Sequence, residues 1–171
     1  MRNVIVFWLV FLGFTSLVHS KEISNNALDY EKMILLDAED LAEHGILSAY
    51  AVIKPELAKY VEKPIELKEN PATNIHAYQI IANGEVYDIY GPTQPDDECQ
   101  SLGRATYALF KIVNDQLKNS DVKFYAFNSG NNLGGMFLSA QQYQEAIVTL
   151  PTMTDWPYLP NQEHPWYGQP N

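Results

Sequence analysis

Hydrophobic and polar residues alternate on both sides of the Asn-Gly dipeptide at residues 83–84, in the stretch IHAYQIIANGEVYDIYG. Two alternating segments joined by Asn-Gly predict a β-hairpin with a type I′ turn, because both central residues of that turn need a positive φ angle. Counting outward from the turn pairs Ile80 with Tyr87 and Tyr78 with Ile89. These residues share the more apolar face of the hairpin, which we expect to face the core.

Two segments show apolar residues at helical spacing. The first predicts a helix over residues 38–53, with Asp37 as its N-cap and Pro55 preventing a smooth continuation. The second predicts a longer helix that begins after Ser101 as its N-cap. Its buried stripe is expected to contain Leu102, Thr106, Leu109, Phe110, Val113 and Leu117.

The remaining segments predict further strands and a third helix. Residues 64–70 alternate and read as a strand before the hairpin, whereas residues 122–128 are apolar on both faces, as in a central strand. A short strand is expected near residues 136–138, and a capping box within residues 139–142 starts the last helix. The order α-β-β-β-α-β-β-α predicts an α+β fold with about three helices on a mainly antiparallel sheet.

The two ends of the chain differ from the part between them. Residues 1–20 have one basic residue, an apolar run and small residues before a cut, which predicts a cleaved signal peptide rather than a membrane anchor. We therefore expect an exported protein, periplasmic or extracellular, with no stable membrane insertion after cleavage. Residues 21–149 are expected to form one domain. Residues 150–171 hold five prolines, two tryptophans and two tyrosines, which predicts a strap packed on that domain.

The chain is strongly acidic, with a formal net charge of −10 at pH 7. Removing residues 1–20 removes one charge, that of Arg2, and leaves −11. Such a surface repels nucleic acid and favours a basic protein partner. No cofactor motif is present in the sequence.

The glycine- and asparagine-rich segment NSGNNLGG, residues 128–135, is the first candidate for a binding surface. It contains no lysine and is followed by an expected strand, so it does not match a phosphate-binding loop. We expect Gly130, Gly134 and Gly135 to turn the chain by supplying positive φ angles, and the loop to contact a protein partner. The predicted contact residues are Asn128, Ser129, Asn131 and Asn132, together with Asp96, Asp97, Trp156 and Tyr158 elsewhere in the chain.

Cys99 is the only cysteine, so the chain has no internal disulfide framework. A cysteine before a helix can be activated, and His76 is its candidate base. The acidic residues that precede Cys99 oppose this, because they raise a thiol pKa. No metal site is expected, and His44 is predicted to be solvated rather than a ligand.

Three hypotheses follow for the function. The preferred one is an acidic inhibitor of the immunity type, which neutralises a toxic or lytic enzyme of the cell envelope. The alternatives are a small envelope hydrolase using Cys99 and His76, and a cell-wall binding module using the C-terminal aromatic residues.

Overall fold

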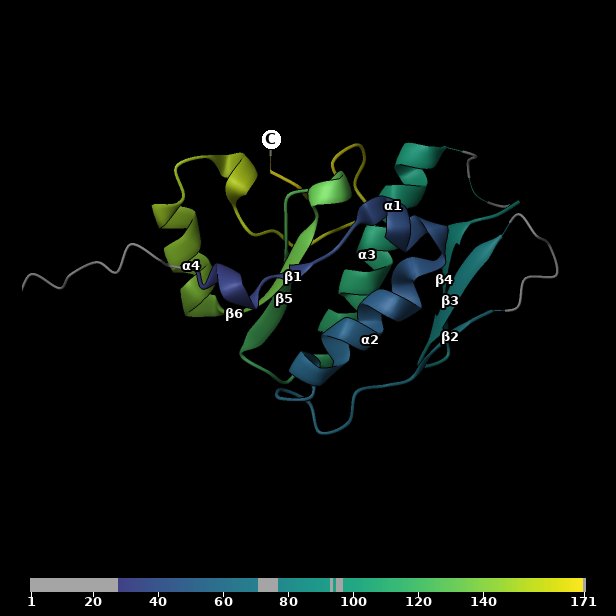
Figure 1. The fold of residues 1–171 in the computed structure, drawn as a ribbon, viewed down its shortest axis with the longest axis horizontal. Coiled ribbons are helices and arrows are strands. Elements are labelled where there is room, and N and C mark those ends of the chain that lie inside the picture. Colours follow the sequence, from purple (N-terminus) through teal and green to yellow (C-terminus); the bar gives the residue numbers. More distant parts are fainter. Residues whose placement is uncertain (1–27, 71–76, 93, 95–96, 171) are drawn as a thin grey trace, which may run out of the picture.

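The computed structural model describes residues 28–70, 77–92, 94 and 97–170. Its elements form two antiparallel three-stranded sheets, in the orders β1-β6-β5 and β2-β3-β4, with α2 and α3 between them and α4 on the outer face of the first sheet (Figure 1). The helices and strands are β1 Ile34–Leu35, α1 Ala38–Asp40, α2 Ile46–Leu57, β2 Leu67–Glu69, β3 Tyr78–Ala82, β4 Glu85–Tyr90, α3 Glu98–Gln116, β5 Val122–Phe127, β6 Gly134–Ser139 and α4 Ala140–Thr149.

The α+β class is confirmed, with three long helices and antiparallel strands. The strands form two sheets rather than the single sheet expected, because α2 and α3 separate the β3–β4 hairpin from the β5–β6 hairpin (Figure 1). The expected signal peptide, residues 1–20, lies outside the described residues. In the described part of the chain, no helix is both long and apolar enough to cross a membrane.

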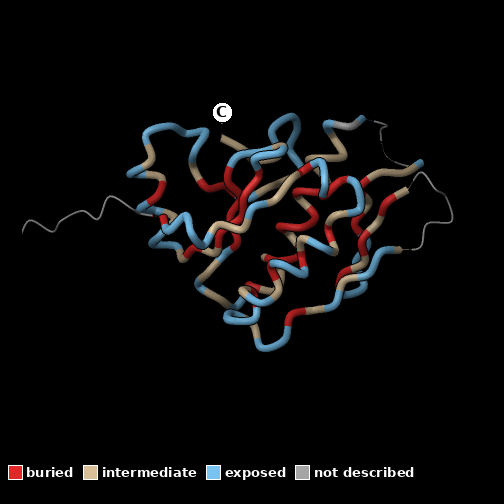
Figure 2. The backbone as a smooth tube through the Cα atoms, viewed as in Figure 1, coloured by how far each residue is buried: buried red, intermediate tan, exposed pale blue. Residues whose placement is uncertain are grey.

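Two clusters of buried side chains reflect this layering. The larger cluster joins α2 and α3 to the inner faces of both sheets, and the smaller one lies between the first sheet and α4. Buried residues accordingly lie along α3, β5 and β6 (Figure 2). The predicted stripe on α3 is confirmed, since Leu109, Val113 and Leu117 are all buried.

The β3–β4 hairpin has the predicted turn and core face, with Ile80 opposite Tyr87. Its open end differs from the prediction, because Tyr78 pairs with Tyr90 rather than with Ile89. A turn sets the register only while the ladder stays regular, and here a bulge adds one residue to β4. The extra residue brings the rings of Tyr78 and Tyr90 within 5.9 Å of each other.

The first helical segment is broken before Pro55, not at it. Glu43 and His44 leave helical geometry, with His44 at a φ angle of 72°, and α2 then runs from Ile46 through Pro55 to Leu57. The prediction that the helix stops at residue 53, because Pro55 prevents a smooth continuation, is wrong. A proline in the last turn removes one N–H donor from a helix that ends two residues later.

The start of α3 also differs from the prediction. The helix begins at Glu98, and its N-cap is Asp97, whose carboxylate accepts a hydrogen bond from the backbone N–H of Gln100. Ser101, the expected N-cap, lies inside the helix. By contrast, the capping box of Ser139 and Gln142 at α4 is confirmed in both of its hydrogen bonds.

The C-terminal segment packs on the domain through its aromatic residues. Tyr158 forms an antiparallel bridge with Ala126, so the segment covers the outer edge of β5. Farther along, the Tyr167 hydroxyl donates a hydrogen bond to the carbonyl of Gln100, and its ring covers Gly103 of α3. These contacts hold the segment against both β5 and α3.

Candidate functional site

The loop that joins β5 to β6 is built from two left-handed residues and one buried anchor. Asn128 and Gly130 have φ angles of 54° and 57°, which reverse the chain through a short 3₁₀ turn, Gly130–Asn132. Leu133 then enters the core and its carbonyl accepts a hydrogen bond from the N–H of Leu36. The loop therefore turns the chain, as predicted, and is fixed to β1 at its end.

Gly134 and Gly135 have a different role from the one expected. The sequence suggested that they supply positive φ angles, but neither does so. A Cβ at Gly135 would lie 2.1 Å from the ring of Phe124, and one at Gly134 would lie 2.7 Å from the sulfur of Met33. These glycines are required for close packing, which a local pattern does not reveal.

The loop forms one side of an open groove of about 640 Å³, called here the loop groove. The rest of its lining comes from β1 with its flanking residues, from the short turn Met153–Asp155 and from Gln169. The lining residues are Met33, Leu35, Leu36, Asn128, Ser129, Asn131, Asn132, Leu133, Thr154, Asp155 and Gln169. Side-chain amides and hydroxyls thus line the same surface depression as apolar side chains from β1 and its neighbours.

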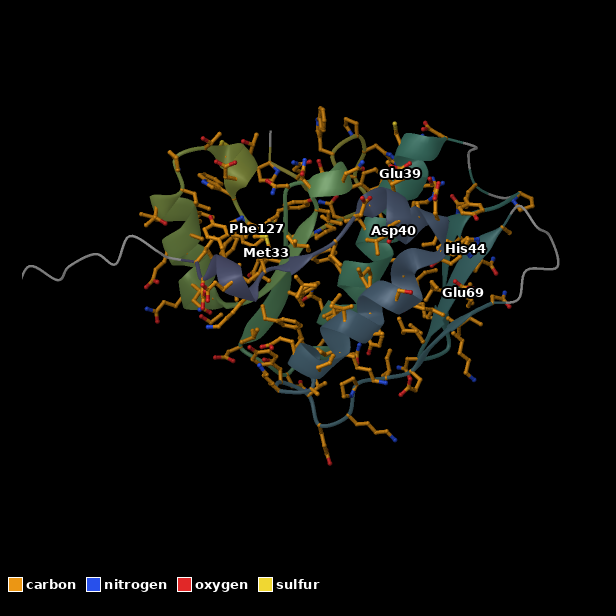
Figure 3. The ribbon with its side chains drawn as sticks, viewed as in Figure 1. Met33, Glu39, Asp40, His44, Glu69 and Phe127 are labelled. Carbon is orange, nitrogen blue, oxygen red and sulfur yellow. The ribbon has the colours of Figure 1, made fainter. Side chains whose placement is uncertain are left out.

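A second depression, of about 400 Å³, continues the loop groove toward α1 and α2. The two share Leu35, Leu36 and Asn131, so they form one continuous surface. The second depression adds Asp37 and Asp40, of which Asp40 can be followed on α1 in Figure 3.

The combined surface is acidic, with the carboxylates of Asp37, Asp40 and Asp155 along it. Among the described residues that line it, none is lysine, arginine or histidine. One Asp37 oxygen is already used, since it accepts hydrogen bonds from the first N–H groups of α1. The surface therefore favours a positively charged partner.

Leu35 is the functional candidate that the sequence analysis missed. Leu35 is 81% exposed, although it lies on a strand between partly buried residues. In the sequence, residues 33–36 form only a short apolar run before the first predicted helix. What identifies Leu35 is the pairing of β1 with β6, which places it beside the asparagine loop.

The predicted contact residues divide into two groups. Asn128, Ser129, Asn131 and Asn132 are exposed and lie together in the loop groove. Asp97 belongs to the second group: it caps α3 and does not line this surface. Asp96 lies outside the described residues.

The two aromatic candidates of the C-terminal segment are largely used inside the protein. Tyr158 is 7% exposed, and its hydroxyl donates a 2.7 Å hydrogen bond to the carbonyl of Asn128. Burial raises the pKa of this hydroxyl to about 12, which keeps it a donor at neutral pH. The half-buried Trp156 donates its indole N–H to the carbonyl of Leu150. Tyr158 therefore supports the loop from beneath and is not a surface contact.

His44 is exposed, as predicted, with 53% of its side chain accessible, but it is not isolated. Its Nε2 lies 2.9 Å from the hydroxyl of Tyr90, and its Nδ1 lies 3.5 Å from Glu69 (Figure 3). The ring of Tyr78 packs tilted against the same ring, with centroids 4.3 Å apart, and its hydroxyl accepts a hydrogen bond from the N–H of Ile46, the first residue of α2. The cluster of His44, Glu69, Tyr78 and Tyr90 links the helix break to the second sheet. Its Tyr78 hydroxyl also provides an acceptor for the backbone N–H at the start of α2.

Cys99 is exposed in the first turn of α3. Its proposed base, His76, lies outside the described residues. Across the residues that the structure describes, no group of three or more His, Cys, Asp or Glu side chains is placed to hold a metal ion.

The chain matches no protein-family model, no curated protein and no solved structure, so its function has to be inferred from its own residues.

Proposed function

We propose that this chain is an exported, acidic protein-binding protein, most concretely an immunity-type inhibitor of a toxic or lytic enzyme of the cell envelope. The observation that carries this proposal is the loop groove, where exposed amides, carboxylates and an exposed leucine lie on one continuous surface. The proposed export rests on residues 1–20 of the sequence.

The groove combines the components that protein interfaces use. Leu35 supplies an apolar side chain that a partner can cover, and polar groups lie around it as at the rim of an interface. Asn131 and Asn132 each offer an amide donor and acceptor on a loop held from below by Tyr158. A preformed loop loses little conformational entropy when it binds, which favours affinity.

The charge of the groove indicates the kind of partner. Asp40 and Asp155 attract a basic surface over several ångströms and speed its approach, as many enzyme–inhibitor pairs do. Enzymes that act on anionic polymers present such basic clefts. A lytic or nucleolytic enzyme of the envelope therefore suits this surface better than an acidic partner does.

The proposal is tested by capture and inhibition together. The chain comprising residues 21–171 is immobilised and exposed to an envelope extract, and the captured protein is identified and assayed for lytic activity. We expect a basic enzyme whose activity falls when one equivalent of the chain is added. Capture without any inhibition would contradict the inhibitor proposal.

The groove is then tested by variants. Asn131→Ala combined with Asn132→Ala should weaken partner binding by about tenfold or more, because interface hydrogen bonds left unpaired cost roughly 1–3 kcal/mol each. Asp40→Asn combined with Asp155→Asn should slow association and reduce its dependence on salt. The matched control, Asn119→Ala with Gln141→Ala, removes two exposed amides outside the groove and should leave binding unchanged.

The structure gives less support to the two other hypotheses, the cell-wall binding module and the cysteine hydrolase. A cell-wall binding module needs several exposed rings, but Tyr158 is buried and Tyr167 is tied to α3, which leaves Trp166 as an exposed ring of the described segment. A cysteine hydrolase depends on His76, which the structure does not describe.

A further inference from the structure

A separate cavity of about 370 Å³ opens at the C-terminal end of α3. None of its lining residues lines the loop groove. Its apolar walls include Tyr107 and Phe110 of α3 and Leu159 and Pro160 of the C-terminal segment. The segment is held there by the pairing of Tyr158 with β5. The C-terminal segment therefore forms part of the cavity wall, and the cavity volume lies in the range of small-molecule sites.

The rim of this cavity is basic, in a chain with 21 acidic and 11 basic residues. Lys111, Lys118 and Lys123 all line it, with Asp115 as the accompanying carboxylate. Asp115 pairs with Lys111 at 2.5 Å and with Lys118 at 3.4 Å, so it offsets one of the three positive charges. Lys123 is exposed on β5, and Lys118 keeps 71% of its side chain exposed.

We propose that this cavity binds a free amphiphilic anion, with its hydrocarbon chain against the apolar walls and its carboxylate or phosphate head at Lys118 and Lys123. Burial of the chain provides the main driving force, and the lysines select a negative head group over a positive or neutral one. The inference is independent of the proposed inhibitor function, because it uses a different surface and the opposite charge.

The shape and charge of the cavity disfavour other occupants. Nucleic acid requires an extended basic surface, whereas the lysines here surround a single depression in an acidic protein. A membrane surface would meet the neighbouring acidic residues as well as the lysines, and Asp121 follows the lining residue Ser120 directly. A free amphiphile small enough to enter the cavity avoids both problems.

The test compares three probes that share one hydrocarbon chain. Decanoate, decanol and decyltrimethylammonium are titrated, each below its micelle concentration, into the isotopically labelled chain of residues 21–171, and amide shifts are followed by NMR. We expect decanoate to shift the amides of α3, β5 and Leu159, and to bind about tenfold more tightly than the cationic probe. Equal affinity for the anionic and cationic probes would overturn the proposal.

Variants then assign the head-group contact. Lys118→Gln combined with Lys123→Gln should lower decanoate affinity by about fivefold or more and remove the preference for the anion. The matched control, Lys32→Gln combined with Lys68→Gln, changes two exposed lysines elsewhere and should have no effect. An unchanged affinity in the first double variant, with the fold intact by amide shifts, would overturn the assignment.

Two further probes separate the sources of the anion. Decyl phosphate should bind in place of decanoate, whereas inorganic phosphate alone should bind far more weakly, because it has no chain to bury. Equal binding of the two phosphates would contradict a role for the apolar walls. Binding to anionic lipid vesicles without binding to monomeric decanoate would indicate a membrane contact and would overturn the proposal for a free ligand.

Discussion

The two hairpins of this protein are closed in different ways. The β3–β4 hairpin turns through Asn83 and Gly84, with φ angles of 51° and 85°, and an added Cβ at Gly84 would meet no atom within 4 Å. The β5–β6 hairpin turns through residues 128–133, where Tyr158 supports one end of the loop and Leu36 the other.

This difference separates a local turn from a supported loop. The short turn depends on the conformational preferences of its own residues and projects into solvent. The longer loop could adopt many shapes alone, and contacts from β1 and the C-terminal segment select one of them. Those same contacts form the loop groove, so the supported loop is the one that carries the proposed binding surface.

The largest expected effect comes from removing the C-terminal segment after residue 150. This change exposes the edge of β5 and deletes the buried Tyr158, and it should lower the free energy of unfolding by about 3–5 kcal/mol. Denaturant unfolding measures the loss. Hydrogen exchange should accelerate in β5 and residues 128–133 but stay unchanged at the turn of residues 83–84. Equal acceleration at both turns would contradict the distinction between them.

The next largest effect is expected at the junction of the supported loop with β6. Gly135→Val should cost about 2–3 kcal/mol, because its Cβ overlaps the buried ring of Phe124. Gly134→Val is the matched comparison and should cost less, since the flexible side chain of Met33 can move away. Thermal unfolding of both variants checks the order, and the reverse order would show that packing on Phe124 is not the constraint.

A smaller effect is expected from Tyr158→Phe. The ring stays buried while the hydrogen bond to the carbonyl of Asn128 is lost, so stability should fall by about 1–2 kcal/mol. Partner binding should weaken at the same time, because the loop loses its support. Wild-type stability in this variant would mean that the loop keeps its shape without the hydroxyl.

Gly84→Ala and Gly130→Ala compare the two turns directly. Both glycines have positive φ angles and open space around them, so each change should cost about 1 kcal/mol. The variants should differ in function, since we expect only Gly130→Ala to weaken partner binding. Calorimetric unfolding and binding to the captured enzyme measure the two effects, and an equal loss of binding would remove the special role of the longer loop.

The smallest effect on stability is expected for Asn131→Ala with Asn132→Ala. Both side chains are exposed, so unfolding should change by less than about 1 kcal/mol. Urea unfolding provides the measurement. A larger loss would show that these amides hold the loop together instead of serving a partner.

Much of the fold could be predicted because its signals are local. The Asn-Gly turn needs only the φ preferences of two residues, and the capping box at α4 needs only Ser139 and Gln142. The apolar stripe of α3 reports its buried face directly, because helical periodicity relates sequence spacing to one side of the helix.

The helix break at His44 could not be predicted in this way. It depends on the Tyr78 hydroxyl, distant in sequence, which accepts the N–H of Ile46, and on Glu69 and Tyr90 beside the imidazole. Only the folded structure shows why residue 45 has to be glycine: a Cβ there would lie 2.3 Å from the carbonyl oxygen of Asp40. No periodic pattern reports such contacts.

The candidate site shows the same division. Sequence alone identified the exposed asparagines, because glycine and amide residues between two apolar strands favour a surface loop. Only the tertiary structure placed Leu35 beside them, buried Tyr158 beneath them and joined both to the acidic start of α1. The physical reason is that turns and caps depend on neighbours in the chain, whereas a groove depends on which distant segments pack against each other, and that choice is made by burial across the whole core.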